Sequence, residues 1–167
     1  MPPGGADVNE HLVRKYGGTP EQFEANRAAI RARGAAVGFE FSPAGRGRIY
    51  NTFNAHRLLH WAGQQGDDQQ LALKRALLEA YHGRSEAVEQ DAVLLAAVKK
   101  AGLDEARAQE ILASDEFAAE VRAAERHYQQ AGISSVPAVI INDRHLISGG
   151  QPPEVFEQAL RQLAQSV

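Results

Sequence analysis

The sequence lacks cysteine entirely: none occurs among its 167 residues. A chain without cysteine forms no disulfide, offers no thiolate nucleophile and builds no cysteine-ligated zinc site. Thiol chemistry is therefore excluded for this polypeptide acting by itself, whatever fold it adopts.

Long apolar runs and an excess of basic charge are absent as well. No apolar stretch approaches the roughly 20 residues that span a bilayer. The opening segment MPPGGADVNEH has neither the basic nor the apolar part of a signal peptide. The formal net charge is -3, which gives no support for a nucleic-acid or anionic-membrane partner. We therefore expect a cytoplasmic protein that binds neither nucleic acid nor membrane.

The composition that remains is that of an ordinary globular protein, with 44% hydrophobic and 23% charged residues. Apolar residues recur at helical spacing between helix start and stop signals. They predict about eight helices, which begin near residues 7, 19, 52, 67, 91, 104, 114 and 152. Between the second and third of these helices, Val37–Phe41 is extended and a candidate short strand, and the loop Ser42–Gly47 is a candidate boundary between subregions.

One β-hairpin is expected near the carboxyl end, between Gly132 and Gly150. The apolar run Val139–Ile141 is followed by the turn signal Asn142-Asp143 and a second short apolar segment. Pro137 stands at the entrance of the first strand, one of the few places where a cis X-Pro bond is a reasonable expectation, although most such bonds are trans. Helix dominates this pattern, so the predicted fold class is mainly α, or α+β.

Three segments together resemble the DsbA family of thioredoxin-fold proteins, and within it the FrnE-like branch related to 2-hydroxychromene-2-carboxylate isomerases. The first is Asn51–Leu58, similar to an N-T-x-x-A-H-R-L signature. The second is Ala80-Tyr81 followed by Gly102–Asp104, similar to A-Y and G-L-D landmarks. The third is GISSVP from Gly132, followed by ISGGQ from Ile147, similar to a G-I-x-x-V-P loop and an I-S-G-A-Q ending. In this order they cover almost the whole chain.

The resemblance implies a partial thioredoxin-like fold with a large helical domain. Residues 1–113 would be the helical insertion domain, and residues 114–167 would be the carboxyl-terminal α-β-β-α half of the thioredoxin-like domain. The strand and C-P-x-C segment that open the family pattern have no counterpart in this chain. We therefore assign no catalytic residue, and the family resemblance alone leaves open whether this chain is an enzyme.

The resemblance also implies a substrate-binding loop at Val136 and Pro137, whose backbone would pair with an extended substrate segment. A strand-initiating proline with no ligand is the competing interpretation. Ser135, like Ser134 beside it, could contact a substrate, although loop serines more often serve as hydrogen-bonding caps. The catalytic serine of the isomerase relatives would lie in the segment that has no counterpart here.

His56 and Arg57 lie in the N-T-x-x-A-H-R signature and are candidates to line the cleft between the two domains. The competing interpretation is that the segment caps a helix and that Arg57 makes a structural ion pair. His56 and His60 have the i, i+4 spacing that can chelate zinc, but Arg57 occupies the position of the catalytic glutamate and no third ligand is evident. We assign no metal.

The leading hypothesis is a DsbA/FrnE-like thiol-disulfide oxidoreductase relative that acts on protein or small thiol substrates, truncated here and inactive in thiol exchange. One alternative is a 2-hydroxychromene-2-carboxylate isomerase-like enzyme that uses glutathione; otherwise no cofactor is expected. The other is a non-catalytic helical module that binds a peptide.

An isolated hairpin is marginal in water and would expose the edge of Val139–Ile141. We therefore expect that edge to be covered by a homodimer, by strand exchange or by Val37–Phe41 of the same chain.

Overall fold

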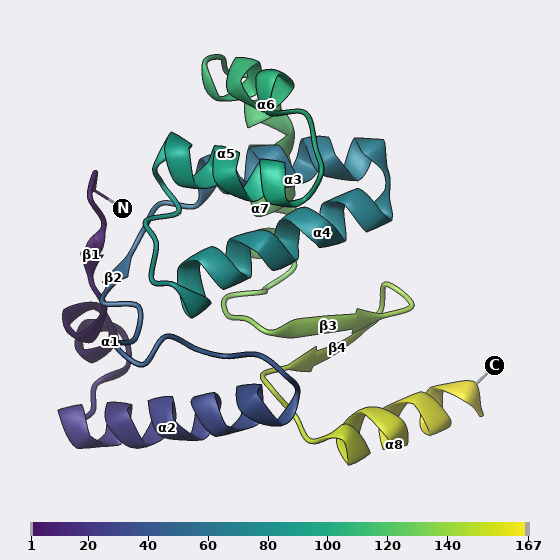
Figure 1. Ribbon diagram of the computed structural model, residues 1–167. Coiled ribbons are helices and arrows are strands. Elements are labelled where there is room, and N and C mark those ends of the chain that lie inside the picture. Colours follow the sequence, from purple (N-terminus) through teal and green to yellow (C-terminus); the bar gives the residue numbers. More distant parts are fainter. Residues whose placement is uncertain (1, 166–167) are drawn as a thin grey trace. The chain divides into compact units, whose positions relative to one another are not determined.

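The computed structural model describes residues 2–165, which form α-helices, one π-helical turn and two small antiparallel sheets (Figure 1). The helices are α1 Val8–Tyr16, α2 Pro20–Ala36, α3 Phe53–Gln65, α4 Asp67–Leu78, α5 Asp91–Lys100, α6 Glu105–Leu112, α7 Ala118–Gln130 and α8 Pro153–Ala164. The strands are β1 Ala6–Asp7, β2 Arg48–Ile49, β3 Ala138–Ile141 and β4 His145–Ser148. The chain divides into two compact units, Met1–Val121 and Arg122–Val167.

Local capping explains where several helices begin. The Asp7 carboxylate accepts hydrogen bonds from the backbone N–H groups of Asn9 and Glu10, at 2.8 and 3.0 Å, and so starts α1. Thr19 and Gln22 form the reciprocal capping box that their spacing predicts, and it starts α2. These contacts satisfy donors that would otherwise have no partner in the first helical turn.

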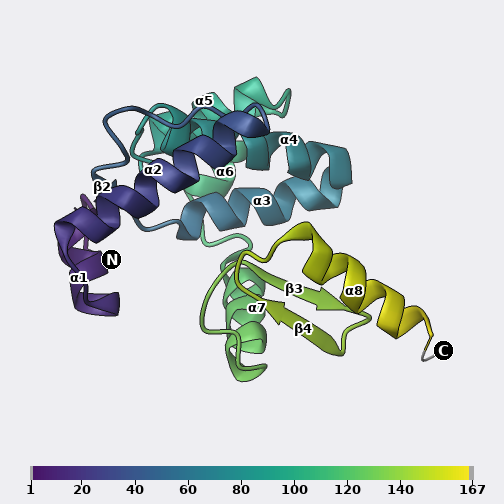
Figure 2. The ribbon, with the colours of Figure 1, turned by 90° about the horizontal axis from the view of Figure 1, so that it is seen from below.

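The hydrophobic core belongs to the first unit and lies among α3, α4, α5 and α6, which gather in one bundle (Figure 2). Each of these helices contributes at least one apolar side chain that is fully shielded from water, among them Leu58, Leu73, Leu94 and Ile111. The sharp turn from α3 into α4 passes through Gly66, whose φ of 144° is accessible chiefly to glycine. This turn lets the two helices pack against one another directly.

Two local predictions are corrected by the structure. Val37–Phe41 is not a strand but an irregular segment, and the only strands before α3 in the described residues are β1 and β2, which pair with each other. The helix expected from Ser114 begins at Ala118, because Phe117 adopts a φ of 61° that interrupts the helical backbone. The helix expected from Asp67 is present as α4 and continues into a π-helical turn, Glu79–Gly83.

The second unit contains the predicted hairpin. Strands β3 and β4 are antiparallel, with Ala138 opposite Ser148 and Ile141 opposite His145. Asn142 and Asp143 both have positive φ, of 52° and 54°, which is typical of the tight turns that suit hairpins. Among residues 2–165 this sheet has two strands only, and Val37–Phe41 forms no strand. No residue described in α8 is buried.

Among residues 2–165, no helix has both the length and the apolar character needed to cross a membrane.

Candidate substrate-binding loop

The loop between α7 and β3 carries the Val136–Pro137 pair. The peptide bond between these two residues is cis. On one side of the loop, the Ile133 N–H donates to the Tyr128 carbonyl at 3.0 Å, which closes the end of α7. On the other side, the Gly149 N–H donates to the Pro137 carbonyl at 2.8 Å and joins the loop to the end of the hairpin. The Val136 side chain lies between these anchors and is 86% exposed.

The hairpin register determines which backbone groups of β3 face outward. Because Pro137 bonds to Gly149, the residues at odd positions of β3 are directed at β4. Ala138 and Ile140 therefore present their N–H and C=O groups to the opposite edge. This edge has no partner strand among the described residues. It continues into Val136, for which the described residues provide no backbone hydrogen bond.

The side chains of this region are apolar and accessible. Val136, Val139 and Ile140 are all exposed, at 86%, 39% and 40%. Ser134 and Ser135 are exposed in the loop, and neither side chain makes a hydrogen bond within residues 2–165. Neither serine therefore has a neighbouring base that would activate its hydroxyl among these contacts. The loop offers a backbone edge and an apolar surface, not a nucleophile.

Arg57 lies inside the first unit, Met1–Val121, where it is only 4% exposed. Its Nε donates to the Glu116 carbonyl at 2.8 Å and its Nη1 to Asn54 Oδ1 at 3.0 Å. Its Nη2 donates to the carbonyls of Ile111 and Ser114. The ion pair of the competing interpretation is wrong, since the partners are three backbone carbonyls and the side-chain oxygen of Asn54. Arg57 ties α3 to the segment that follows α6, which is a structural role.

His56 is exposed on α3, and its neighbour His60 lies against the Phe117 ring, with ring centroids 5.2 Å apart. In the part of the chain that the structure describes, no three histidine, aspartate or glutamate side chains come together as a group that could hold a metal ion. Asn51, not Thr52, supplies the side-chain oxygen at the start of α3, accepting from the Phe53 N–H at 2.9 Å.

The loop residues Val136 and Pro137 are predicted from the sequence, but the outward-facing amides of Ala138 and Ile140 are not. The sequence does contain a signal for these amides. Backbone N–H groups along a hairpin strand point alternately toward and away from the partner strand, and the position of Pro137 indicates which residues of β3 face β4. What the sequence could not supply is the Pro137–Gly149 hydrogen bond that fixes this alternation.

Comparisons with known proteins identify the family. The family model described as a DSBA-like thioredoxin domain matches residues 1–161. A crystal structure of a probable DsbA oxidoreductase from Streptomyces coelicolor superposes with a TM-score of 0.82 and 34% sequence identity. The alignment covers 93% of this chain and 66% of that one. A search of curated proteins found no match.

The chain therefore belongs to the DsbA-like thioredoxin domain family. The family resemblance and the mainly α, α+β fold class predicted from the sequence are both confirmed. The chain spans 66% of the length of the Streptomyces coelicolor structure, just under two thirds. The expected boundary between residues 113 and 114 stays a prediction, and the compact units described above meet at residue 121 instead.

Proposed function

We propose that this chain carries the substrate-binding side of a DsbA-type thiol-disulfide oxidoreductase and binds an extended polypeptide along the outer edge of β3. The chain itself performs no thiol exchange, because it contains no cysteine. The observation that carries the proposal is the continuous outward edge formed by Val136, Ala138 and Ile140, which has no partner strand among the described residues.

Physical chemistry supports a peptide at this edge. Open strand edges bind extended segments by adding a strand, and main-chain hydrogen bonds then provide most of the affinity. The exposed side chains of Val136 and Ile140 offer apolar contacts to alternate residues of the added strand. A peptide recognised mainly through its backbone can have many sequences, as a disulfide-processing protein requires.

The matched pair Ala138 and Ser148 makes the proposal testable. These residues lie opposite each other in the register, and each directs its N–H away from the hairpin, on β3 and β4 respectively. Proline at either position removes one outward donor and leaves the hydrogen bonds between the strands. Ala138→Pro thus blocks the β3 edge, while Ser148→Pro changes the β4 edge alone.

The probe is insulin B chain whose cysteines have been carboxamidomethylated, so that binding is measured without thiol exchange. Titration followed by backbone NMR should shift the amide signals of Ala138 and Ile140 in the wild type and in Ser148→Pro. Ala138→Pro should weaken binding about tenfold, the effect of losing one main-chain hydrogen bond. Equal weakening by both substitutions, or no binding by the wild type, would contradict the proposal. Insulin reduction by dithiothreitol should not be accelerated by this chain.

We also propose that, without substrate, two copies of the chain pair through the same edge. An exposed apolar edge favours pairing with another strand, and β3 can pair with its own copy in the antiparallel direction. Sedimentation equilibrium should then show a dimer for the wild type and Ser148→Pro and a monomer for Ala138→Pro. A wild type that stays monomeric at all concentrations would refute this homodimer while leaving the peptide proposal intact.

Placement in the FrnE-like branch is part of the proposal and is supported by the Asn51–Leu58 and Ile147–Gln151 segments. A glutathione-dependent isomerase activity has no specific observation in its favour here. Glutathione binding that competes with the carboxamidomethylated B chain would support that alternative.

A further inference from the structure

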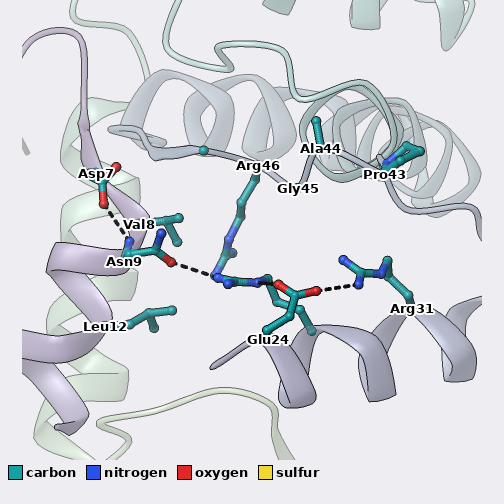
Figure 3. Close-up of a pocket in the computed structure, with 12 residues that line it drawn as sticks. Asp7, Val8, Asn9, Leu12, Glu24, Arg31, Pro43, Ala44, Gly45 and Arg46 are labelled. Carbon is teal, nitrogen blue, oxygen red and sulfur yellow. Dashed lines mark hydrogen bonds and ion pairs between the residues drawn. The ribbon is translucent and has the colours of Figure 1, made fainter. Parts of the chain in front are cut away.

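The first unit, Met1–Val121, contains two adjoining cavities that lie apart in sequence from the proposed peptide-binding edge. They have volumes of about 250 and 150 Å³. Both are lined by Arg27 and Arg31 from α2 and by Gly45 and Arg46 from the loop that precedes β2. Figure 3 shows the Arg46 side chain extending from this loop into the larger cavity, opposite Glu24 and Arg31 of α2. The shared lining makes the two cavities a single candidate site.

Several hydrogen bonds hold the loop in place. The Ser42 N–H donates to the His82 carbonyl at 2.8 Å, and the Ser85 hydroxyl donates to the Gly45 carbonyl at 2.6 Å. The Tyr81 hydroxyl donates to the Arg48 carbonyl at 2.9 Å. Tyr81 and His82 lie in the π-helical turn at the end of α4, a feature that often occurs at functional sites. The loop is therefore anchored on both sides of Arg46.

Around the site, arginine side chains outnumber carboxylates: Arg27, Arg31 and Arg46 against Asp7 and Glu24. Glu24 accepts from Arg27 Nε at 2.8 Å and from Arg31 Nη2 at 2.7 Å, so one carboxylate serves two guanidinium groups. Asp7, the other lining carboxylate, is engaged as the cap of α1. Arg46 forms no ion pair within residues 2–165, and its guanidinium lies over the Tyr81 ring, 5.8 Å from the centroid. It keeps its capacity to bind an anion.

The neighbouring ionisable groups keep this imbalance at neutral pH. Hydrogen bonds from Arg31 and Arg27 lower the pKa of Glu24, which stays ionised and remains committed to those two residues. Burial, and then the charge of Arg46, lower the pKa of His82. His82 is therefore neutral at pH 7 and presents a flat, uncharged ring to the smaller cavity.

The smaller cavity is lined on its other side by apolar and aromatic groups. Ile30 is 51% exposed and lines this cavity together with Phe41 and His82. The rings of Phe41 and His82 are packed edge to face, with centroids 5.8 Å apart. A cavity of about 150 Å³ has the size that holds one benzene ring.

We propose that this site binds a small aromatic carboxylate, with the carboxylate on Arg46 and the ring between Ile30, Phe41 and His82. The planar guanidinium matches a carboxylate in a two-point hydrogen-bonding geometry. Arg46 lines both cavities and so lies beside the apolar recess. This arrangement suits a ligand with an anionic end and an apolar end. The site lies wholly within the first unit and is independent of the β3 edge.

The alternative is that Arg46 is structural and acts solely by stacking on Tyr81. This alternative makes a different prediction, because a stacking residue confers stability and no ligand binding. Arg46→Gln retains much of the side-chain length and removes the charge. Arg33→Gln is the matched control: Arg33 is exposed on α2, the same helix as Arg27 and Arg31, and it lines neither cavity.

The experiment measures binding of benzoate, benzyl alcohol and inorganic phosphate to the full chain by NMR titration, with folding of each variant verified by circular dichroism. Benzoate should bind in the millimolar range or tighter and shift the signals of Gly45 and Gly47. Arg46→Gln should weaken benzoate binding about tenfold or more, as expected for a charge-assisted hydrogen bond, and Arg33→Gln should not change it.

Three results would overturn the proposal: no saturable benzoate binding by the wild type, equal binding by Arg46→Gln, or equal binding of benzyl alcohol. Phosphate binding as tight as that of benzoate would overturn the assignment of the ring to the apolar recess. If Arg46→Gln fails to fold, Phe41→Leu tests the recess instead. This variant should weaken benzoate and leave phosphate unchanged, and equal benzoate binding by Phe41→Leu would refute the proposal.

Discussion

Removing the Arg57 guanidinium should lower the free energy of unfolding of the first unit, although Arg57 pairs with no carboxylate. In Arg57→Ala, the carbonyls of Ser114 and Glu116 lose their donor, whereas the Ile111 carbonyl keeps the Ser114 N–H at 3.2 Å. A buried acceptor left without a partner costs about 1–3 kcal/mol. These two carbonyls are only partly buried, so each loss lies at the low end of this range. Together with the lost packing of a side chain that is 4% exposed, they predict a loss of about 2–4 kcal/mol in the free energy of unfolding.

The chain provides its own probe for this measurement. Trp61 is the single tryptophan, is 5% exposed and lies one turn after Arg57 on α3. Urea unfolding followed by its fluorescence yields the free energy of unfolding from the midpoint and slope. Arg57→Lys should lie between wild type and alanine, because one ammonium reaches fewer carbonyls than a planar guanidinium. The exposed Arg75→Ala is the control and should stay within about 0.5 kcal/mol of wild type.

A loss below about 1 kcal/mol in Arg57→Ala would refute this reasoning, since it would mean that water replaces the guanidinium at little cost. An equal loss in Arg57→Lys would also contradict it. In that case the shape of the guanidinium, and not the number of donors that reach the carbonyls, would determine stability.

Two further predictions concern the region around Phe41. Gly34→Ala should destabilise the chain, although alanine favours a helix more than glycine does, because the added Cβ would lie 2.5 Å from Phe41 Cε2. Urea unfolding should show the lower free energy of unfolding. Adding Phe41→Leu to the same chain should recover part of this loss. Burial, and then the charge of Arg46, lower the pKa of His82 below its usual value of 6.5. The unfolded chain therefore binds a proton at His82 more readily than the folded chain does. The free energy of unfolding should be fully maintained above pH 6.5 and should fall as the pH drops below it. His82→Gln should abolish this pH dependence of the unfolding free energy, and a His82 NMR titration midpoint at or above 6.5 would contradict it.

The sequence predicts the helices well because their signals are local. Asp7, Thr19 and Asp104 occupy cap positions, and the structure shows each of them accepting the backbone N–H groups expected. The hairpin is equally local, since Asn142 and Asp143 tolerate the positive φ of the turn. Family membership followed from short motifs in the right order.

The predictions that failed depend on distant contacts. Val37–Phe41 has strand-like alternation, but the Phe39 N–H turns back to the Gly34 carbonyl at 2.9 Å and the rings of Phe39 and Phe41 pack against each other. Arg57 looked like a surface residue of a cleft, and nothing local reveals that the segment around Ser114 offers it three carbonyls. The cavity at Arg46 joins residues from α1, α2 and a loop, so no sequence spacing indicates it.

The unequal distribution of the core has a consequence for how the chain unfolds. Every buried hydrophobic side chain among residues 2–165 belongs to the segment from Val8 to Val121, and the hairpin and α8 contribute none. The two units therefore differ in the free energy needed to open them, and the second is expected to exchange its amide hydrogens by local opening long before the first unfolds. Fluorescence of Trp61 reports on the first unit alone. A single free energy of unfolding is then not defined for the whole chain. The stability of the hairpin depends on the affinity and concentration of any strand that binds its open edge.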